Sequence, residues 1–291
     1  MDYNRMTREN LLSQKRFPVT VVKDVRALHK RCGRVLVDLV KRNNKAGRDT
    51  SVILPIGPLE YKPFAAISKK ETISLRRLSI FMMDEYVGDD GKAIPESHPL
   101  SFARFMRQSF LRHLEPRLEF SEDRLLMPRP ENLLQISDAI LGMGGVDLCF
   151  AGMGLTGHLA FNDPPEPEDL TGAISDPLQW LRQSRARLLA VSRESCAQMA
   201  MGGTHGNWDV LPRQACTLGM RELLASKHIH LTFMRDWHSG VLRRALFGPI
   251  AASCPGSLVQ EHSSVEATLT EIAARPPLLN VAQDTGEQAE T

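Results

Sequence analysis

The chain has 291 residues, of which 42% are hydrophobic and 24% are charged, which excludes a wholly disordered or fibrous protein. Lys and Arg (36) nearly balance Asp and Glu (34), so we expect no nucleic-acid partner, because binding a phosphate backbone needs a clear excess of positive charge. No run approaches the ~18 apolar residues of a membrane span, and the first twenty residues lack an apolar signal-peptide core. We therefore expect no membrane association.

The cysteines indicate the redox compartment. There are five, an odd number, and none forms a Cys-x-x-Cys pair: Cys32, Cys149, Cys196, Cys216 and Cys254. This usage is typical of reduced thiols in a cytoplasmic protein and argues against a disulfide framework or a cysteine zinc site.

Helix-like and strand-like segments alternate along the chain. Apolar residues recur at helical spacing over residues 25–39, 61–67, 99–114, 134–143, 241–247 and 265–274. Short apolar runs predict buried strands at 51–54, 78–83, 146–150, 230–234 and 257–260. Alternation of this kind predicts an α/β fold with a mostly parallel sheet and helices on both faces, a Rossmann-like three-layer sandwich.

We expect one domain over residues 21–278, preceded by an N-terminal extension (1–20) and followed by a polar tail (279–291). The segment 164–183 is rich in proline and acidic residues and predicts an exposed loop or lid.

Ligands of such sheets bind where the strands end at their carboxyl edge. Three strands here end in unusual sequences: Pro55-Ile-Gly57-Pro58, Asp84-Glu85-Tyr86, and Gly152-Met-Gly154-Leu-Thr-Gly157-His158. The third has the spacing of a dinucleotide-binding loop, but the following Asn162-Asp163-Pro164-Pro165 breaks the chain where a helix should begin, so we reject that interpretation.

Two acidic residues and one histidine are the candidates for proton transfer. His158 lies five residues before Asp163, and an imidazole oriented by a carboxylate is a common general acid–base pair. From spacing alone, a surface loop residue is the favoured interpretation of His158, and a helix cap or solvated turn residue is slightly favoured for Asp84.

Three segments, in the same order, resemble the glucosamine-6-phosphate deaminase (isomerase) family over roughly residues 20 to 275. They are Phe81-Met-Met-Asp-Glu-Tyr-Val-Gly88 with Pro95-Glu-Ser-His-Pro-Leu-Ser-Phe102, then Gly152-Met-Gly-Leu-Thr-Gly-His-Leu-Ala-Phe-Asn-Asp-Pro164, and Val210-Leu-Pro-Arg-Gln-Ala-Cys-Thr-Leu-Gly219. The phrase Ala160-Phe-Asn-Asp-Pro164 is closer to the deaminases than to the related 6-phosphogluconolactonases.

The resemblance implies reversible conversion of an amino-sugar phosphate to a ketose phosphate and ammonia, without a metal or organic cofactor. It implies His158, oriented by Asp163, for ring opening and Asp84 as the base at the carbon beside the carbonyl. It also implies a set of substrate-binding residues: Gly57, Glu85, Gly154, Thr156, Gly157 and His238. The implied partner is a small sugar or sugar phosphate, and the family often forms homo-oligomers.

The chain departs from the family where phosphate is held. Pro58, Leu59 and Glu60 replace a loop rich in glycine and threonine, and none of them offers a suitable donor or charge. His238 stands near the family's phosphate-binding lysine and Met201 near its arginine. Replacement cations could come from Arg185, Arg187, Arg193, Lys62, Lys69 or Lys70, although a solvated surface position is the favoured interpretation of each.

Thr156 replaces an acid two residues before the histidine, and Asp163 replaces a glutamate. Three alternatives follow: an active enzyme with an altered substrate, a non-catalytic sugar-binding or regulatory protein on the same fold, or a lactonase-like hydrolase that needs His158 but not Asp84. His228 and His230 alternate on a predicted strand, but a metal site there would need a third ligand that the sequence does not place.

Overall fold

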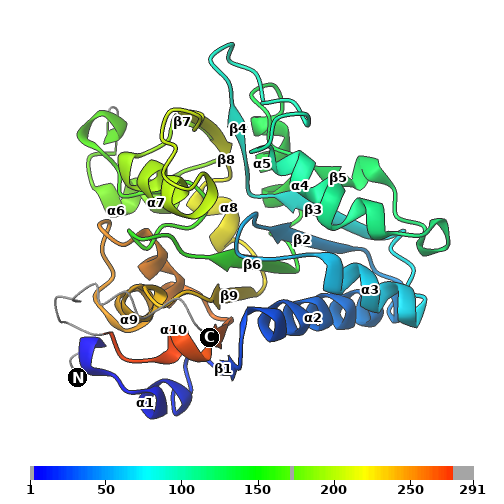
Figure 1. Cartoon of the computed structure of the whole chain (residues 1–291), viewed down its shortest axis with the longest axis horizontal. Coiled ribbons are helices and arrows are strands. Elements are labelled where there is room, and N and C mark those ends of the chain that lie inside the picture. The colour runs from blue at the N-terminus through cyan, green and yellow to red at the C-terminus, as the bar shows by residue number, and fades with distance from the viewer. Residues whose placement is uncertain (1–2, 171–173, 278–291) are drawn as a thin grey trace.

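The computed structural model describes residues 3–170 and 174–277, and its centre is a seven-stranded parallel sheet (Figure 1). The strand order is β1-β10-β9-β6-β2-β3-β5, and every neighbouring pair is parallel. The strands are β1 (Val19–Val22), β2 (Thr50–Leu54), β3 (Leu78–Met82), β5 (Leu125–Leu126), β6 (Leu148–Gly152), β9 (Ile229–Phe233) and β10 (Val265–Thr270). A second, antiparallel sheet has the order β4-β8-β7, formed by β4 (Asp84–Val87), β8 (Gln214–Thr217) and β7 (Arg187–Ala190).

Helices cover both faces of the central sheet, which confirms the predicted α/β class. They are α1 (Arg8–Leu12), α2 (Val25–Lys45), α3 (Lys62–Glu71), α4 (Phe102–Ser109), α5 (Leu133–Gly142), α6 (Pro177–Gln183), α7 (Arg193–Gly203), α8 (Met220–Leu224), α9 (His238–Phe247) and α10 (Glu271–Ala274). Successive strand residues face opposite ways, so Val52 and Leu54 of β2 pack in the cluster that includes α2 and α3, whereas Ile53 packs in the cluster that includes α5 and α9. Two apolar layers therefore hold one sheet between two sets of helices.

The order of the strands places a switch point between β2 and β6. From β2 the chain continues outward to β3, and it later returns to place β6 on the other side of β2. Loops that leave such neighbours diverge at the carboxyl edge and leave room for a ligand. The loops carrying Gly57 and His158 follow these two strands.

The last part of the chain differs from the prediction. Residues 257–260, expected as a strand, lie in a 3-10 helix (Pro255–Glu261), and residues 265–270, expected as a helix, form β10. Val265, Ala267 and Leu269 alternate into the core, but Val265, Leu269 and Ile272 also match a helical spacing, and that match misled the prediction. Only Glu271–Ala274 of the expected helix is helical.

Other boundaries also moved. The helix expected to run to Leu114 ends at Ser109 and is followed by a 3-10 turn, because Phe110 leaves helical geometry. The acidic residues expected to end a strand instead begin β4 of the second sheet. The segment 164–183, expected as a loop, ends in α6, with Asp176 as its N-cap.

The N-terminal residues pack into the core. Met6, Leu11 and Phe17 are buried, and the expected boundary between residues 20 and 21 lies inside β1. The buried guanidinium of Arg243 donates to the carbonyls of Met6 (2.9 Å) and Ala274 (3.1 Å), which joins the N-terminal segment to α10. The expected tail, 279–291, lies outside the described residues.

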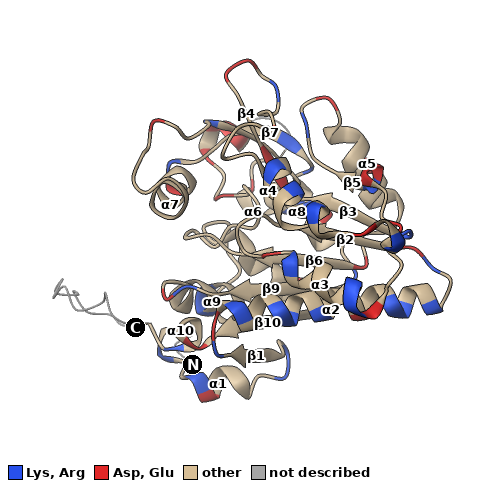
Figure 2. Cartoon of the chain, turned by 45° about the vertical axis from the view of Figure 1, so that its right-hand side comes forward, with Lys and Arg blue, Asp and Glu red and all other residues tan. Residues whose placement is uncertain are grey.

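Surface charge is mixed. Lys and Arg recur along α2 and elsewhere alternate with Asp and Glu (Figure 2). Within the described residues, no helix combines the length and apolar character needed to span a bilayer.

Candidate active site

The histidine expected to be catalytic lies in the loop after β6. Gly154 N–H donates to the His158 carbonyl (3.1 Å) and Gly157 N–H to the Gly154 carbonyl (2.8 Å), so the loop folds back on itself. A Cβ atom at position 154 would lie 2.0 Å from His158 Cε1, and Gly157 has a φ of +82°. Glycine is required at both positions, for close packing and for the turn respectively. Both glycines therefore shape the loop that presents His158, and their contact with substrate stays a prediction.

Asp163 holds the imidazole through a fully occupied carboxylate. Its Oδ1 accepts from His158 Nδ1 (2.7 Å) and Thr156 Oγ1 (2.8 Å), and its Oδ2 accepts from Ser192 Oγ (2.8 Å) and Ser195 Oγ (2.6 Å). Burial raises the pKa of Asp163, but the hydrogen bonds from His158, Ser195 and Ser192 outweigh burial and lower the pKa to about 2.

The ionised carboxylate fixes the tautomer of His158. Because a carboxylate only accepts hydrogen bonds, we assign the imidazole proton to Nδ1. Among the described residues, none forms a hydrogen bond with Nε2, and His158 is only 7% exposed. Nε2 is therefore the atom available to exchange a proton with a ligand.

Sequence reasoning missed the residues that support Asp163 from α7. Ser192 is the N-cap of this helix and accepts from Ser195 N–H (3.0 Å), so the carboxylate lies at the positive end of the helix dipole. Gln198 Oε1, one turn further on, accepts from Leu155 N–H (2.8 Å) and holds the histidine loop against the helix. Two serines three residues apart are the one local sign of this helix start, and nothing local links them to Asp163.

Asp84 is a buried carboxyl group at the junction of the two sheets. It follows β3 after one residue, Met83, and begins β4. It is 7% exposed, and among the described residues no hydrogen bond to its carboxyl group is formed. Burial, with a smaller contribution from the charge of Glu85, raises the pKa of Asp84 to about 8. A carboxyl group that is buried, unpaired and titrates near neutral pH is suited to general base catalysis.

Glu85, expected to bind substrate, instead supports α4. Its Oε1 accepts from the backbone N–H groups of Tyr86 and Phe102, both at 3.0 Å, and its Oε2 accepts from Ala103 N–H (2.9 Å) and Ser101 Oγ (3.2 Å). The side chain is buried, and its acceptors are occupied by the first turn of the helix. The structure therefore assigns Glu85 a capping role rather than a ligand contact.

The end of β8 brings the Asp84 and His158 segments together. Thr217 pairs with Asp84 in the second sheet, and its Oγ1 accepts from Phe161 N–H (3.1 Å). Leu218 donates its N–H to the Met83 carbonyl (2.8 Å), and its own carbonyl accepts from Asn162 Nδ2 (2.8 Å). The segments that carry Asp84 and His158 are thus both fixed to the same two residues at the carboxyl edge of the sheet, and their joint role in proton transfer stays a prediction.

His238, expected to bind substrate, is a neutral side chain with both ring nitrogens engaged. Its Nδ1 accepts from the backbone N–H groups of Met234 (2.8 Å) and Arg235 (3.1 Å), and its other nitrogen interacts with the Met153 carbonyl. Burial, assisted by the charge of Arg235, lowers the pKa of His238 to about 4. His238 therefore carries no charge for an anion and instead joins the loops after β9 and β6.

The other expected phosphate positions also lack donors. Pro58 packs against Gly152, where a Cβ atom would lie 2.4 Å from the proline Cγ, and Leu59 is buried. Gly57, with a φ of +93° and open space around it, provides the turn of this loop. Met201 is 76% exposed. No family-like cradle for phosphate is formed by these residues.

The proposed replacement cations differ in their surroundings. Lys62 pairs with Glu60, Lys69 with Glu115, and Arg185 with Asp138. Arg187 donates to Asn162 Oδ1 (2.8 Å), and its guanidinium carbon lies 4.9 Å from the centre of the Trp180 ring.

One cation outside that set lies near His238 and near Gly202, the neighbour of Met201. Arg235 is exposed in the short loop between the end of β9 and His238, the first residue of α9. A Cβ atom at Gly202, next to Met201, would lie 3.7 Å from Arg235 Nη2. The guanidinium of Arg235 therefore lies beside α7 at Gly202, and its charge also acts on His238.

The chain is similar to known proteins in sequence and in fold. No family model matches the chain. The chain is 30% identical over 209 residues to a glucosamine-6-phosphate deaminase of Rhodopirellula baltica, an alignment that covers 69% of this chain and 73% of the relative. It is 27% identical to the corresponding deaminase of Streptomyces avermitilis, over 88% of this chain and 91% of the relative.

Solved structures share the fold. A monomeric glucosamine-6-phosphate deaminase superposes with a TM-score of 0.73 at 20% identity, covering 89% of this chain and 99% of that one. The 6-phosphogluconolactonase of Leishmania guyanensis superposes with a TM-score of 0.61 at 12% identity, covering 88% and 96%. From its sequence identity and coverage, the chain belongs to the glucosamine-6-phosphate deaminase family.

Proposed function

We propose that this chain converts a 2-amino-2-deoxy sugar phosphate into the corresponding ketose phosphate and ammonia by general acid–base catalysis. The observation that carries the proposal is the pairing at one sheet edge of two different acid–base groups. One is an imidazole oriented by an ionised carboxylate, and the other is a buried carboxyl group whose pKa is about 8. Isomerisation of a ring-closed sugar needs both kinds of group.

His158 would open the ring. Its Nε2, which forms no hydrogen bond with the described residues, would take the proton of the anomeric hydroxyl and return a proton to the ring oxygen, which gives the open-chain aldehyde. Asp163 stabilises the imidazolium that forms between these two transfers, because its carboxylate is already ionised and hydrogen-bonded to Nδ1.

Asp84 would then move a proton between carbons. In its ionised form it removes the proton from the carbon that bears the amino group, giving an enolamine. Returning that proton to the neighbouring carbon leaves a ketimine, to which water adds before ammonia departs. With a pKa of about 8, Asp84 is ionised in roughly a tenth of the molecules at pH 7, so turnover should rise with pH toward 8.

Arg235 would meet the anionic end of the substrate. It is exposed at the carboxyl edge and lies near both positions at which the family has cations, Met201 and His238. One guanidinium in place of a cation pair and a backbone cradle implies weaker binding of phosphate. We therefore expect a kcat/KM for glucosamine 6-phosphate below about 10⁴ M⁻¹s⁻¹, the lower end of the ordinary enzyme range.

The decisive experiment measures ammonia release and solvent-deuterium incorporation with a panel of phosphorylated and unphosphorylated amino sugars. Wild type should release ammonia and incorporate deuterium, Asp84→Asn should lose at least about 10²-fold in both, and Asp209→Asn, an exposed carboxylate, should match wild type. Arg235→Ala should raise KM with little change in kcat.

Other outcomes would contradict the proposal. Hydrolysis of a sugar lactone that survives Asp84→Asn would favour a lactonase. Ligand binding by wild type without ammonia release or deuterium incorporation from any sugar would favour a non-catalytic binding protein.

A further inference from the structure

A second cluster of ionisable side chains lies at the opposite edge of the sheet. His228 directly precedes β9, His230 is the second residue of β9, and Glu266 is the second residue of β10. The carboxyl ends of these strands lead to the candidate active site, whereas this cluster lies at their amino-terminal ends.

Sheet geometry alone puts these three side chains together. His228 and His230 are two residues apart and so project from the same face, and Glu266 is the registered partner of His230 on the neighbouring parallel strand. The sequence did not supply this third ligand because residues 265–270 were expected to be helical.

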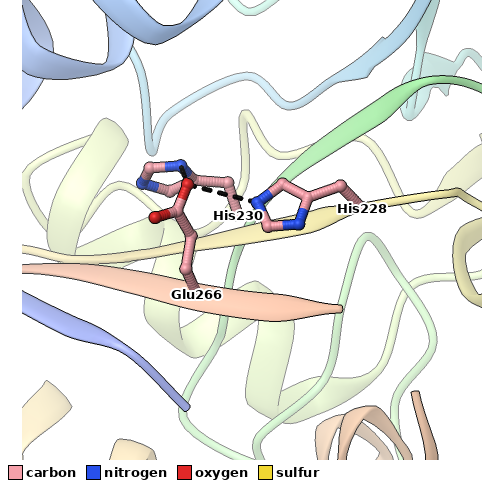
Figure 3. Close-up of side chains that lie close together, drawn as sticks. All are labelled: His228, His230 and Glu266. Atoms are coloured by element: carbon pink, nitrogen blue, oxygen red, sulfur yellow. Dashed lines mark hydrogen bonds and ion pairs between the residues drawn. The ribbon is translucent and has the colours of Figure 1, made fainter. Parts of the chain in front are cut away.

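The ligand atoms converge on one point (Figure 3). His228 Nε2 lies 3.1 Å from Glu266 Oε1, and His230 Nδ1 lies 2.9 Å from the same oxygen. One potential ligand atom from each residue lies within 4.8 Å of the others. In a tetrahedral zinc site, with bonds of about 2.1 Å, ligand atoms are separated by about 3.4 Å. To admit an ion, the two short contacts would lengthen by a few tenths of an ångström, and the two histidine nitrogens would settle about 3.4 Å apart, inside the 4.8 Å limit seen here.

One of these atoms is buried without a hydrogen bond. His230 is fully buried, and its Nδ1 has no hydrogen-bond partner, because the short contact to Glu266 lacks the required direction. Buried polar atoms without a partner are rare and destabilising, and an unplaced ion is one of the explanations for them.

The second layer orients both rings. Ser264 Oγ lies 2.7 Å from His228 Nδ1, and Thr268 Oγ1 lies 2.8 Å from His230 Nε2. In the metal-free chain His228 Nε2 donates to Glu266. When an ion takes the place of that proton, each hydroxyl can accept the proton of the ring nitrogen that faces away from Glu266, so that His228 Nε2 and His230 Nδ1 are free to bind the ion. Arg31 of α2 donates to the same Thr268 hydroxyl (3.2 Å) and closes this layer.

We propose that His228, His230 and Glu266 form a site for a divalent first-row transition metal, with zinc as the natural occupant of a two-histidine, one-carboxylate set. The ion would join β9 to β10 beneath α2. His228 and Glu266 are 31% and 26% exposed at their side chains, so a metal can enter from solvent and keep a water molecule as its fourth ligand. The site is independent of the proposed deaminase reaction, in which none of these residues takes part.

The test uses untagged full-length protein stripped with chelator. Addition of Co²⁺ should give the visible absorption bands of tetrahedral cobalt, saturating at one ion per chain and displaced by Zn²⁺. Zinc at a concentration 100-fold above its Kd should raise Tm by on the order of 5 °C.

His228→Gln and Glu266→Gln should each weaken Co²⁺ binding by at least about 100-fold, more than the typical loss from second-layer changes. His113→Gln, which changes an exposed histidine elsewhere, should bind like wild type. Circular dichroism of the metal-free variants tests whether each is folded. If His228→Gln does not fold, the Co²⁺ affinity of Glu266→Gln alone tests the proposal.

The proposal is overturned if the wild type shows no saturable binding at millimolar Co²⁺. It is also overturned if Glu266→Gln retains wild-type affinity, or if His113→Gln loses as much affinity as the cluster variants. Ammonia release measured in chelator reports separately on the proposed function.

Discussion

Asp84 should make the folded protein less stable as pH rises, and removing its charge should reverse that effect. Its pKa is about 8 in the folded chain against 3.8 for the unperturbed group. The folded state therefore holds this proton more tightly than the unfolded state does. The contribution of Asp84 to stability is fully present below pH 3.8 and is lost progressively as pH rises toward about 8.

The size of the effect follows from that difference. Between the two pKa values, the free energy of unfolding should fall by about 1.4 kcal/mol per pH unit through this group, up to a total of about 6 kcal/mol. Asp84→Asn keeps the shape of the protonated acid but cannot ionise. The variant should match wild type within about 1 kcal/mol near pH 4.5 and exceed it by several kcal/mol near pH 8.5.

Urea denaturation of wild type and variant across this pH range measures the difference directly, because the slope with urea depends on exposed surface and should be equal for the two proteins. Asp209→Asn, which removes an exposed carboxylate, should leave the pH dependence of wild type unchanged. A constant stability difference between wild type and Asp84→Asn at all pH values would refute the reasoning, since it would mean that Asp84 titrates alike in both states. So would a variant less stable than wild type at pH 8.5.

Three further changes test the surrounding structure. Asp163→Asn should lower the free energy of unfolding by about 2 kcal/mol near pH 6, and by progressively less as pH falls from 4 toward 2. The reason is that the folded pKa of about 2 lies below the unperturbed value of 3.8. Urea denaturation at pH 6 and pH 3 measures this difference. Gly154→Ala would place a methyl group 2.0 Å from the His158 ring and should lower ammonia release at least about 10²-fold, while Gly142→Ala, where the added atom meets nothing within 4 Å, should leave it unchanged. Arg243→Met should lower the free energy of unfolding by about 3 kcal/mol and speed proteolysis near the N-terminus, because three carbonyls lose a buried charged donor. Equal digestion rates for variant and wild type would count against the role of Arg243 in holding the N-terminal segment.

The sequence predicted best what is decided locally. Strands buried on both faces appear as short apolar runs, and β2 and β3 lie where such runs predicted them. The pairing of His158 with Asp163 was also accessible, since both belong to one loop and lie five residues apart.

The errors come from interactions between distant segments. β10 has apolar residues on one face only, and its other face carries Glu266 and Thr268, so the strand resembles an amphipathic helix until its neighbour β9 is known. Ser192 and Ser195 reach Asp163 across about thirty residues, and Glu85 reaches the start of α4 across seventeen. Neither contact leaves a periodic signal, because each depends on how the loops at the sheet edge meet.

The candidate site has two parts, the acid–base groups and the anion-binding positions, and they differ in how strictly their geometry is fixed. Proton transfer requires the acid–base groups to lie at hydrogen-bond distance from the reacting atoms, with a tolerance of a fraction of an ångström. Here the candidate groups are held by the segments that follow β3 and β6, the strands on either side of β2, and by Thr217 and Leu218 at the end of β8. Binding of an anion at the far end of a substrate is less exacting, because any cation of sufficient reach can supply the attraction. His238 illustrates the result: the side chain at the lysine position has become a neutral link between two loops, while Arg235, three residues earlier, presents its charge at the same edge. A site of this kind can change what it binds while keeping the step that it performs.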